Sequence, residues 1–218
     1  MALRHRVFLL SPANLAGIRA AQVLNAKAEF ELACRLRETG VPLGELFSFI
    51  SGLYFRGKVT YAGAFSRPPQ GVSGSFVITT SAGLLAPETV VSVERLREFA
   101  ATDIDPADKR YRGPLDRDCR LLAEFLKDAG QVILLGSIAT PKYVEPLLDI
   151  FRERLLFPAE FVGRGDMSRG GILLRAVAAG KELAYIPLLN AVRRGTRPAK
   201  LAPLKVRRVS LEDVERAR

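Results

Sequence analysis

The sequence of 218 residues contains only two cysteines and one histidine. Cys34 and Cys119 lie in segments with a helical pattern of leucine, alanine and arginine, so we expect both to be buried, reduced thiols. This scarcity excludes a disulfide framework and a clustered zinc site. His5 lies in a basic N-terminal segment, R-H-R, where we expect it to be solvated. Any catalysis that depends on histidine would have to use this residue.

The chain also lacks a long apolar run. Its first apolar stretch, V-F-L-L, is broken by Ser11 and Pro12 and is too short for the hydrophobic region of a signal peptide. No segment approaches the roughly 20 apolar residues that span a bilayer. We therefore expect a cytoplasmic protein with no membrane partner.

Positive charge is concentrated at the C-terminus. The formal net charge is +10, and residues 190–218 contain nine Lys or Arg against three Asp or Glu, whereas residues 1–189 contain 24 against 20. We therefore divide the chain into an α/β domain, residues 1–189, and a basic C-terminal extension, residues 190–218. Such an extension favours a polyanionic partner, above all nucleic acid. The alternative is an arginine-rich surface that is only solvated.

Apolar runs and helical periodicities alternate along the chain, whose composition is that of a globular protein. The expected strands are residues 6–10, 75–80, 131–135, 155–157 and 182–187. The expected helices are residues 26–39, 43–55, 93–100, 114–129, 143–152, and 167 or 168 to 179, and the helix over 43–55 continues over 59–65. In the helix over 114–129, Leu121, Leu122, Phe125 and Leu126 lie on one face. A strand over 206–209 or a helix over 210–218 would follow. This order predicts an α/β protein, a three-layer α/β/α fold with a mainly parallel central sheet.

In an open α/β sheet, ligands bind at the carboxyl ends of the strands, so the loops that follow the expected strands are candidate binding segments. Two of these loops combine small hydroxyl residues with glycine. Ser81 lies in one, and the other contains Gly136, Ser137, Thr140 and Lys142. Their amides and hydroxyls would donate to a phosphate, and the lysine would neutralise it. The alternative is an ordinary strand–helix turn with Thr140 as the helix N-cap.

A glycine-rich stretch, G-R-G-D-M-S-R-G-G over residues 163–171, comes directly before an apolar helical segment. Ser168 is the expected N-cap, and Asp166 favours the positive end of the helix. Arg164 and Arg169 would then lie beside free amides and form an anion site, which the four glycines would let a ligand approach closely. Asp166 is also the candidate general base. A turn locked by Arg–Asp pairs is the alternative.

Aromatic and cationic residues interleave in S-G-L-Y-F-R-G-K-V-T-Y-A, residues 51–62. Tyr54 or Tyr61 would stack on a base, while Arg56 and Lys58 would hold its phosphate. The alternative is an aromatic core with cations that extend to the surface.

Four motifs occur in a fixed order over roughly residues 45–175: L-Y-F-R-G-K-V-T-Y-A-G-A-F, F-V-I-T-T-S-A-G-L-L-A-P-E-T-V-V, V-I-L-L-G-S-I-A-T-P-K-Y-V-E-P-L-L and G-R-G-D-M-S-R-G-G. They resemble the landmarks of a uracil-DNA-glycosylase-like domain, which also accompanies deazaguanine-modification enzymes such as archaeosine synthase. The resemblance implies the α/β fold and a nucleotide or nucleic-acid context. It implies no reaction, because the acidic motif after the first strand and the late histidine motif of the glycosylases are not recognisable. Asn14 is the polar residue that would position a water in that first loop.

These patterns favour a protein that binds a nucleotide or nucleic acid and needs no cofactor or metal. Its candidate residues would suit hydrolysis of a nucleobase or nucleotide, with Asp166 and Asn14 positioning the attacking water. The alternative is a non-catalytic nucleic-acid-binding module or a scaffold that docks an acidic protein. The sequence leaves open whether the protein is an enzyme.

Overall fold

A mixed sheet lies at the centre of the protein. The computed structural model describes residues 4–202, and within this range six strands pair in the order β4-β3-β1-β6-β7-β8. The four parallel strands are β1 (Arg6–Leu10), β3 (Ser75–Ile78), β6 (Gln131–Leu135) and β7 (Leu155–Pro158). The antiparallel edge strands are β4 (Leu84–Leu85) and β8 (Tyr185–Pro187). A separate ribbon pairs β2 (Val41–Pro42) with β5 (Val90–Val91).

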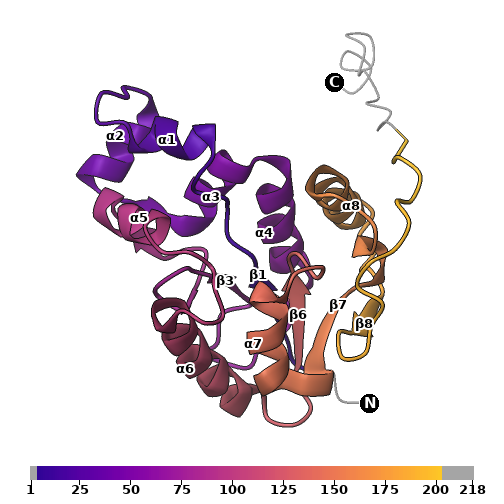
Figure 1. Cartoon of the computed structure of the whole chain (residues 1–218). Helices are drawn as coiled ribbons and strands as arrows, with labels where there is room; N and C mark the ends of the chain where they lie inside the picture. Colours follow the sequence, from indigo (N-terminus) through magenta and orange to yellow (C-terminus); the bar gives the residue numbers. More distant parts are fainter. Residues whose placement is uncertain (1–3, 203–218) are drawn as a thin grey trace, which may run out of the picture.

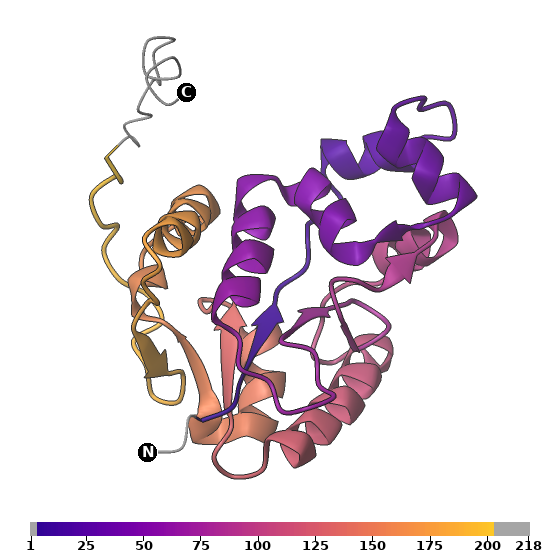
Figure 2. The same ribbon diagram turned by 180° about the vertical axis from the view of Figure 1, so that it is seen from behind.

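Helices cover both faces of the sheet and give three layers (Figures 1 and 2). The α-helices of the described residues are α1 (Ile18–Leu24), α2 (Glu31–Glu38), α3 (Leu43–Ser51), α4 (Leu53–Phe65), α5 (Val93–Ala100), α6 (Lys109–Leu126), α7 (Pro141–Phe151) and α8 (Asp166–Ala178). The chain passes from β1 to its neighbour β3 and then returns to β6 on the other side of β1. Because parallel crossovers are right-handed, the helices before β3 and those after it lie on opposite faces. Accordingly, α4 packs on β1 and β3, whereas α6 packs beside α7, which contacts β7.

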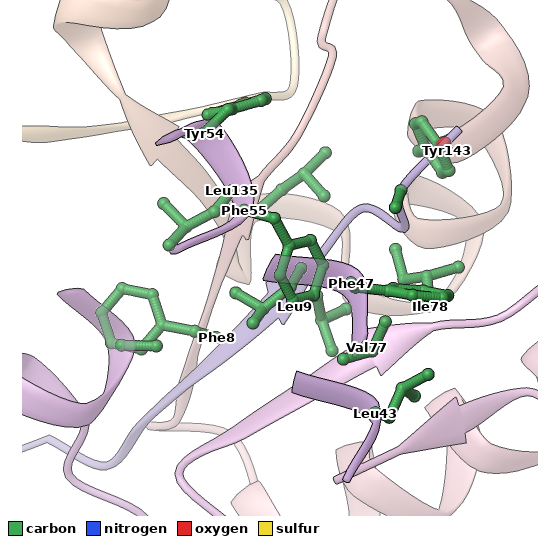
Figure 3. Close-up of a cluster of buried hydrophobic side chains, with 14 of the residues drawn as sticks. Phe8, Leu9, Leu43, Phe47, Tyr54, Phe55, Val77, Ile78, Leu135 and Tyr143 are labelled. Carbon is green, nitrogen blue, oxygen red and sulfur yellow. The ribbon is translucent and has the colours of Figure 1, made fainter. Parts of the chain in front are cut away.

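The core forms where these layers meet (Figure 3). Phe8 and Leu9 of β1 and Val77 of β3 are fully buried, as expected for parallel strands covered on both faces. Phe47 of α3 and Phe55 of α4 pack edge to face above them, with ring centroids 5.4 Å apart. Apolar residues on both faces of the central strands therefore hold the sheet between its two helical layers.

Helices α4 and α8 approach each other unusually closely. A Cβ atom added at Gly170 of α8 would lie 2.8 Å from the carbonyl oxygen of Leu53 and 2.8 Å from the Cα atom of Tyr54. A Cβ atom at Gly57 of α4 would in turn lie 3.0 Å from the carbonyl oxygen of Gly170. The two backbones therefore touch at facing glycines, and neither position has room for a side chain.

The central strands and several helices match the sequence-based expectations. The predictions for residues 6–10, 93–100 and 131–135 are confirmed to the residue by β1, α5 and β6. The α/β/α fold is confirmed as well. The expected elements over 206–209 and 210–218 lie outside the described residues.

Three helix predictions were wrong in their bounds. The single helix expected over 43–55 is two helices, because Gly52 adopts a left-handed φ of 64° and turns the chain between α3 and α4. The segment 26–39 is helical only in α2, and α1 precedes it over residues for which no element was predicted. Helix α6 begins well before residue 114, because the Asp108 carboxylate caps it by accepting from the amide of Arg110 at 2.8 Å.

The expected buried side chains need two corrections. Leu122 and Leu126 of α6 are buried, but Leu121 and Phe125 are about half exposed, because the buried face of the helix runs through Tyr111, Leu115 and Cys119 instead. Cys119 is a buried free thiol, whereas Cys34 is only partly buried. His5 is exposed, as expected. No helix formed by residues 4–202 combines the length and the apolar content needed to cross a bilayer.

We predict that Gly170→Ala destabilises the protein by about 1–3 kcal/mol, because the new methyl group would collide with the backbone of α4. The matched control is Gly63→Ala on the exposed side of α4, where an added Cβ would meet no described atom within 4 Å. That variant should gain about 0.5–1 kcal/mol from helix propensity. Urea unfolding of both variants measures the difference, and equal midpoints would contradict the close helix crossing.

Candidate functional site

A polar cavity of about 550 Å³ opens at the carboxyl ends of the central strands. The residues that follow β1, from Ser11 to Ala16, form one wall, and Ser137 after β6 forms another. These two strands are neighbours, and the chain leaves them in opposite directions along the sheet. Ligands of open α/β proteins bind at such a switch point, because the two departing loops leave a crevice between them.

The structure brings six of the predicted residues to this cavity. They come from four separate segments and are Asn14, Tyr54, Lys58, Ser137, Lys142 and Asp166. Asn14 forms a local turn in which its Oδ1 atom accepts from the amide of Ala16 at 3.0 Å. Asp166 is the first residue of α8, and its side chain is about 70% exposed, so a ligand can reach its carboxylate. Its Oδ1 atom also forms a long ion pair with Nη1 of Arg169 at 3.7 Å, one of the Arg–Asp pairs of the alternative interpretation.

Four other predicted residues do not line the cavity. Arg56 is exposed on the outer face of α4, and Thr140 is exposed at the N-cap of α7. Gly136 is needed for packing, because a Cβ atom there would lie 2.9 Å from the Cβ atom of Ser11. The hydroxyl of Ser81 is buried and finds no hydrogen-bond partner among residues 4–202.

The two arginines of the glycine-rich stretch also point elsewhere. Arg164 donates to the hydroxyl of Ser168 and to the carbonyl oxygen of Ala199, both at 3.2 Å. Arg169 is buried and donates to the carbonyl oxygen of Phe161 through Nε at 3.3 Å and Nη2 at 3.1 Å. Both guanidinium groups therefore hold the protein's own chain in place.

The glycine-rich stretch itself is used for packing more than for ligand approach. Gly163 has a left-handed φ of 70°, and a Cβ atom there would lie 2.3 Å from the carbonyl oxygen of Thr196. Gly170 faces α4, as described above. The N-cap prediction for Ser168 was wrong, because Gly165 is the N-cap residue and Ser168 lies within the first turn of α8. Asp166 does occupy the first turn, where its charge favours the helix N-terminus.

Lys58 is the least expected feature of the cavity. Its side chain is 1% exposed, although it belongs to the lining. Its Nζ atom donates to the carbonyl oxygen of Ser11 at 2.5 Å and to the hydroxyl of Ser11 at 3.0 Å. It also lies 4.4 Å from the ring centroid of Tyr54 and 4.8 Å from that of Phe55. The amine is therefore held at the end of β1 by neutral oxygens and ring faces.

Desolvation lowers the pKa of Lys58 to about 7. The negative charge of Asp166 opposes this shift and the positive charge of Arg169 adds to it. No carboxylate in the described part of the chain lies within ion-pair distance of the amine. Burial likewise raises the pKa of Tyr54, whose hydroxyl has no hydrogen-bond partner within residues 4–202, and the pKa of Tyr143.

Sequence reasoning predicted Lys58 as a phosphate-binding cation, with a cation that extends to the surface as the alternative, and both interpretations missed its burial. A signal was present, because residues 54, 58 and 61 recur at helical spacing and share the buried face of α4. Tyr61 does not reach the cavity, since its hydroxyl lies 2.6 Å from that of Tyr185 inside the core. The lining residues Thr80, Thr102 and Asp103 were not predicted.

The cavity combines charges of both signs. Lys58 and Lys142 face it together with Asp103 and Asp166. Within residues 4–202, no group of three or more His, Cys, Asp or Glu side chains is arranged to hold a metal ion. The lining suits a ligand that carries both an anionic group and hydrogen-bond donors.

We predict that Lys58 makes the stability of the protein rise with pH above about 7. An unfolded lysine, with a pKa near 10.4, keeps its proton in this range, whereas the folded lysine has lost it. Raising the pH therefore favours the folded state, by up to about 1 kcal/mol per pH unit. Denaturant unfolding between pH 7 and about pH 8.5, below the range in which unfolded cysteine and tyrosine lose their protons, should show this slope in the wild type and not in Lys58→Met.

The matched control is Lys27→Met, which replaces an exposed lysine and should keep the wild-type slope. Lys58→Met loses the two contacts with Ser11 and is therefore less stable at every pH. The test is consequently the change of the unfolding free energy with pH and not its absolute value. Parallel curves for the wild type and Lys58→Met would show that the buried amine keeps its proton.

The chain was compared with family models, with curated proteins and with solved structures, and none of the three comparisons finds a match. The resemblance of the sequence motifs to a uracil-DNA-glycosylase-like domain therefore stays a prediction. The ligand of the cavity is therefore inferred from the residues that line it and from their geometry.

Proposed function

We propose that the protein is a hydrolase that binds a nucleotide, free or within a nucleic acid, in the cavity at the ends of β1 and β6. The observation that carries this proposal is the convergence of predicted binding residues from four separate segments on one cavity. Its volume of about 550 Å³ falls within the range of roughly 300–1,000 Å³ that small-molecule sites occupy.

The loop after β6 supports binding of the phosphate. Ser137 offers a hydroxyl, and Lys142 in the first turn of α7 offers a positive charge beside the N-terminus of that helix. Lys142 is only partly buried, and its Nζ atom lies 5.2 Å from the ring centroid of Tyr143. An ammonium group in this position can meet a phosphate without the full cost of desolvation.

The opposite wall supports binding of the sugar and base. Asp166 and Asp103 accept hydrogen bonds, and Asn14 can both donate and accept. Tyr54 and Tyr143, each 4% exposed, add aromatic side chains to the lining. A nucleoside presents hydroxyls, ring N–H groups and an aromatic face, which is the set of groups that these side chains recognise.

Hydrolysis would use the exposed carboxylate of Asp166. In this role Asp166 accepts a proton from a water molecule that Asn14 helps to orient, and the water attacks the bond being cleaved. Lys58 lines the same cavity, and the negative charge of Asp166 acts to raise its pKa. Together they supply an acceptor and a donor of protons.

We predict that Asp166→Asn lowers kcat for base or phosphate release by about 10²–10⁴-fold, because the amide cannot take the proton from water. The substrates are mononucleotides and single-stranded oligonucleotides, and chromatography measures the released base and phosphate. The matched control is Asp128→Asn, an exposed aspartate remote from the cavity. No release by the wild type, or equal release by Asp166→Asn, would contradict the proposal.

A second candidate function, binding of nucleic acid without chemistry, is favoured by the segment 190–202. It carries Arg193, Arg194, Arg197 and Lys200 and no acidic residue. The carbonyl oxygens of Ala199 and Ala202 accept from Arg164 and Arg175, so the segment lies along α8 (Figure 1). Three of its cations, Arg194, Arg197 and Lys200, are exposed.

We predict that replacing Arg194, Arg197 and Lys200 together by Gln weakens single-stranded DNA binding and lowers the slope of log K against log salt by about 2. Each lost phosphate contact removes about 0.7 from that slope for a single strand. Replacing the exposed Lys109, Lys127 and Lys181 by Gln removes equal charge elsewhere and should leave the slope unchanged. Fluorescence anisotropy over a salt series measures the slope for the wild type and for both triple variants. If the variant at Arg194, Arg197 and Lys200 has the wild-type slope, the segment 190–202 does not contact the DNA.

A further inference from the structure

We propose that Lys58 is a nucleophilic amine that forms an imine with an aldehyde or ketone group of a phosphorylated sugar bound in the cavity. This inference rests on the proposed function for the identity of the occupant, and it adds a covalent step that the proposed hydrolysis does not need. When the bond that is hydrolysed joins the sugar to its base, the released sugar phosphate opens to an aldehyde, which is the group that Lys58 would attack.

The surroundings of Lys58 are those of a reactive amine. An amine attacks a carbonyl only through the lone pair of its neutral form, and lysines reach that form near neutral pH when an apolar site desolvates them. Lys58 is surrounded by the rings of Tyr54 and Phe55 and by two oxygens of Ser11. These oxygens accept two of its hydrogens, which leaves the lone pair of the neutral amine for a third direction.

The charged groups around the amine hold it near the point of losing its proton. From α8, Asp166 stabilises the ammonium form and Arg169 destabilises it. Its own helix contributes Tyr54, and the loop after β1 contributes only the neutral Ser11. Desolvation outweighs these charges, which places the pKa near 7.

The covalent step needs no oxidant or reductant. The nitrogen lone pair forms a bond to the carbonyl carbon, and the carbonyl oxygen takes a proton to give a carbinolamine. That hydroxyl then leaves as water, with one proton from the nitrogen, and a C=N bond remains. Asp166 lines the same cavity and is the group available to carry the proton between nitrogen and oxygen. Lys142 and Ser137 would hold the phosphate of the sugar during both stages.

The test is reductive trapping with pyridoxal phosphate, an aldehyde that carries a phosphate, on the full-length chain. Sodium cyanoborohydride fixes any imine, and peptide mass mapping identifies the labelled lysine. We expect labelling of Lys58 to reach half of its maximal rate near pH 7, whereas exposed lysines such as Lys27 and Lys181 rise only toward their usual pKa of about 10.4. Pyridoxal without the phosphate should label Lys58 several-fold more slowly.

Asp166→Asn should shift the midpoint for Lys58 to lower pH, because the charge that favours the ammonium form is gone. Asp128→Asn should leave it in place. Lys58→Arg keeps hydrogen-bond donors toward Ser11 but has no amine that can form an imine, so the peptide that contains residue 58 should carry no label. A midpoint that does not respond to Asp166→Asn would contradict the role given to this carboxylate.

Labelling of exposed lysines with Lys58 unmodified at every pH would overturn the inference. This outcome is independent of turnover, so the two proposals can fail separately. If Lys58 is trapped and no nucleotide is hydrolysed, the proposed function fails and the amine remains a carbonyl-binding site. If hydrolysis depends on Asp166 and Lys58 is never trapped, the hydrolase remains and its lysine is not a nucleophile.

Discussion

The contact between α4 and α8 at two facing glycines is the constraint on which the cavity depends. Gly57 and Gly170 let the helix backbones touch, so residues within one turn of each glycine come together at the ends of the strands. On α4 these residues are Tyr54 and Lys58, and on α8 the helix start brings Asp166. A larger residue at either glycine would separate an amine and a carboxylate that share one cavity.

This contact also explains how a lysine is kept where water cannot reach it. Removing an ammonium group from water is costly, and hydrogen bonds to uncharged oxygens compensate only part of that cost. In the folded protein, desolvation instead lowers the pKa of the amine to about 7, while the oxygens of Ser11 and the ring faces of Tyr54 and Phe55 attract its charged form. The packing of the surrounding core must supply the remaining stability, and the close approach of α8 is part of that packing.

The parts of the fold that local physics determines were predictable from the sequence. Short apolar runs such as residues 131–135 can only be buried strands, and Gly136 after β6 does end its strand at the site. The predictions that failed concern glycines and arginines whose contacts come from residues distant in the chain. The glycines of 163–171 suggest a ligand loop, yet Gly163 and Gly170 accommodate Thr196 and α4. Arg164 and Arg169 look available as anion ligands, yet backbone carbonyls occupy them. Only tertiary packing distinguishes these uses.

The cavity and the basic segment are joined by the loop before α8. Asp166 faces the cavity, while Arg164, two residues earlier, donates to the carbonyl oxygen of Ala199. The cavity walls carry two lysines and two aspartates, a balance suited to one nucleotide and not to a chain of phosphates. The segment 190–202 carries cations alone, which suits a chain of phosphates and not one nucleotide. The hydrolytic and the binding proposal therefore rest on different residues, because no residue of 190–202 lines the cavity and the segment is held instead by Arg164 and Arg175.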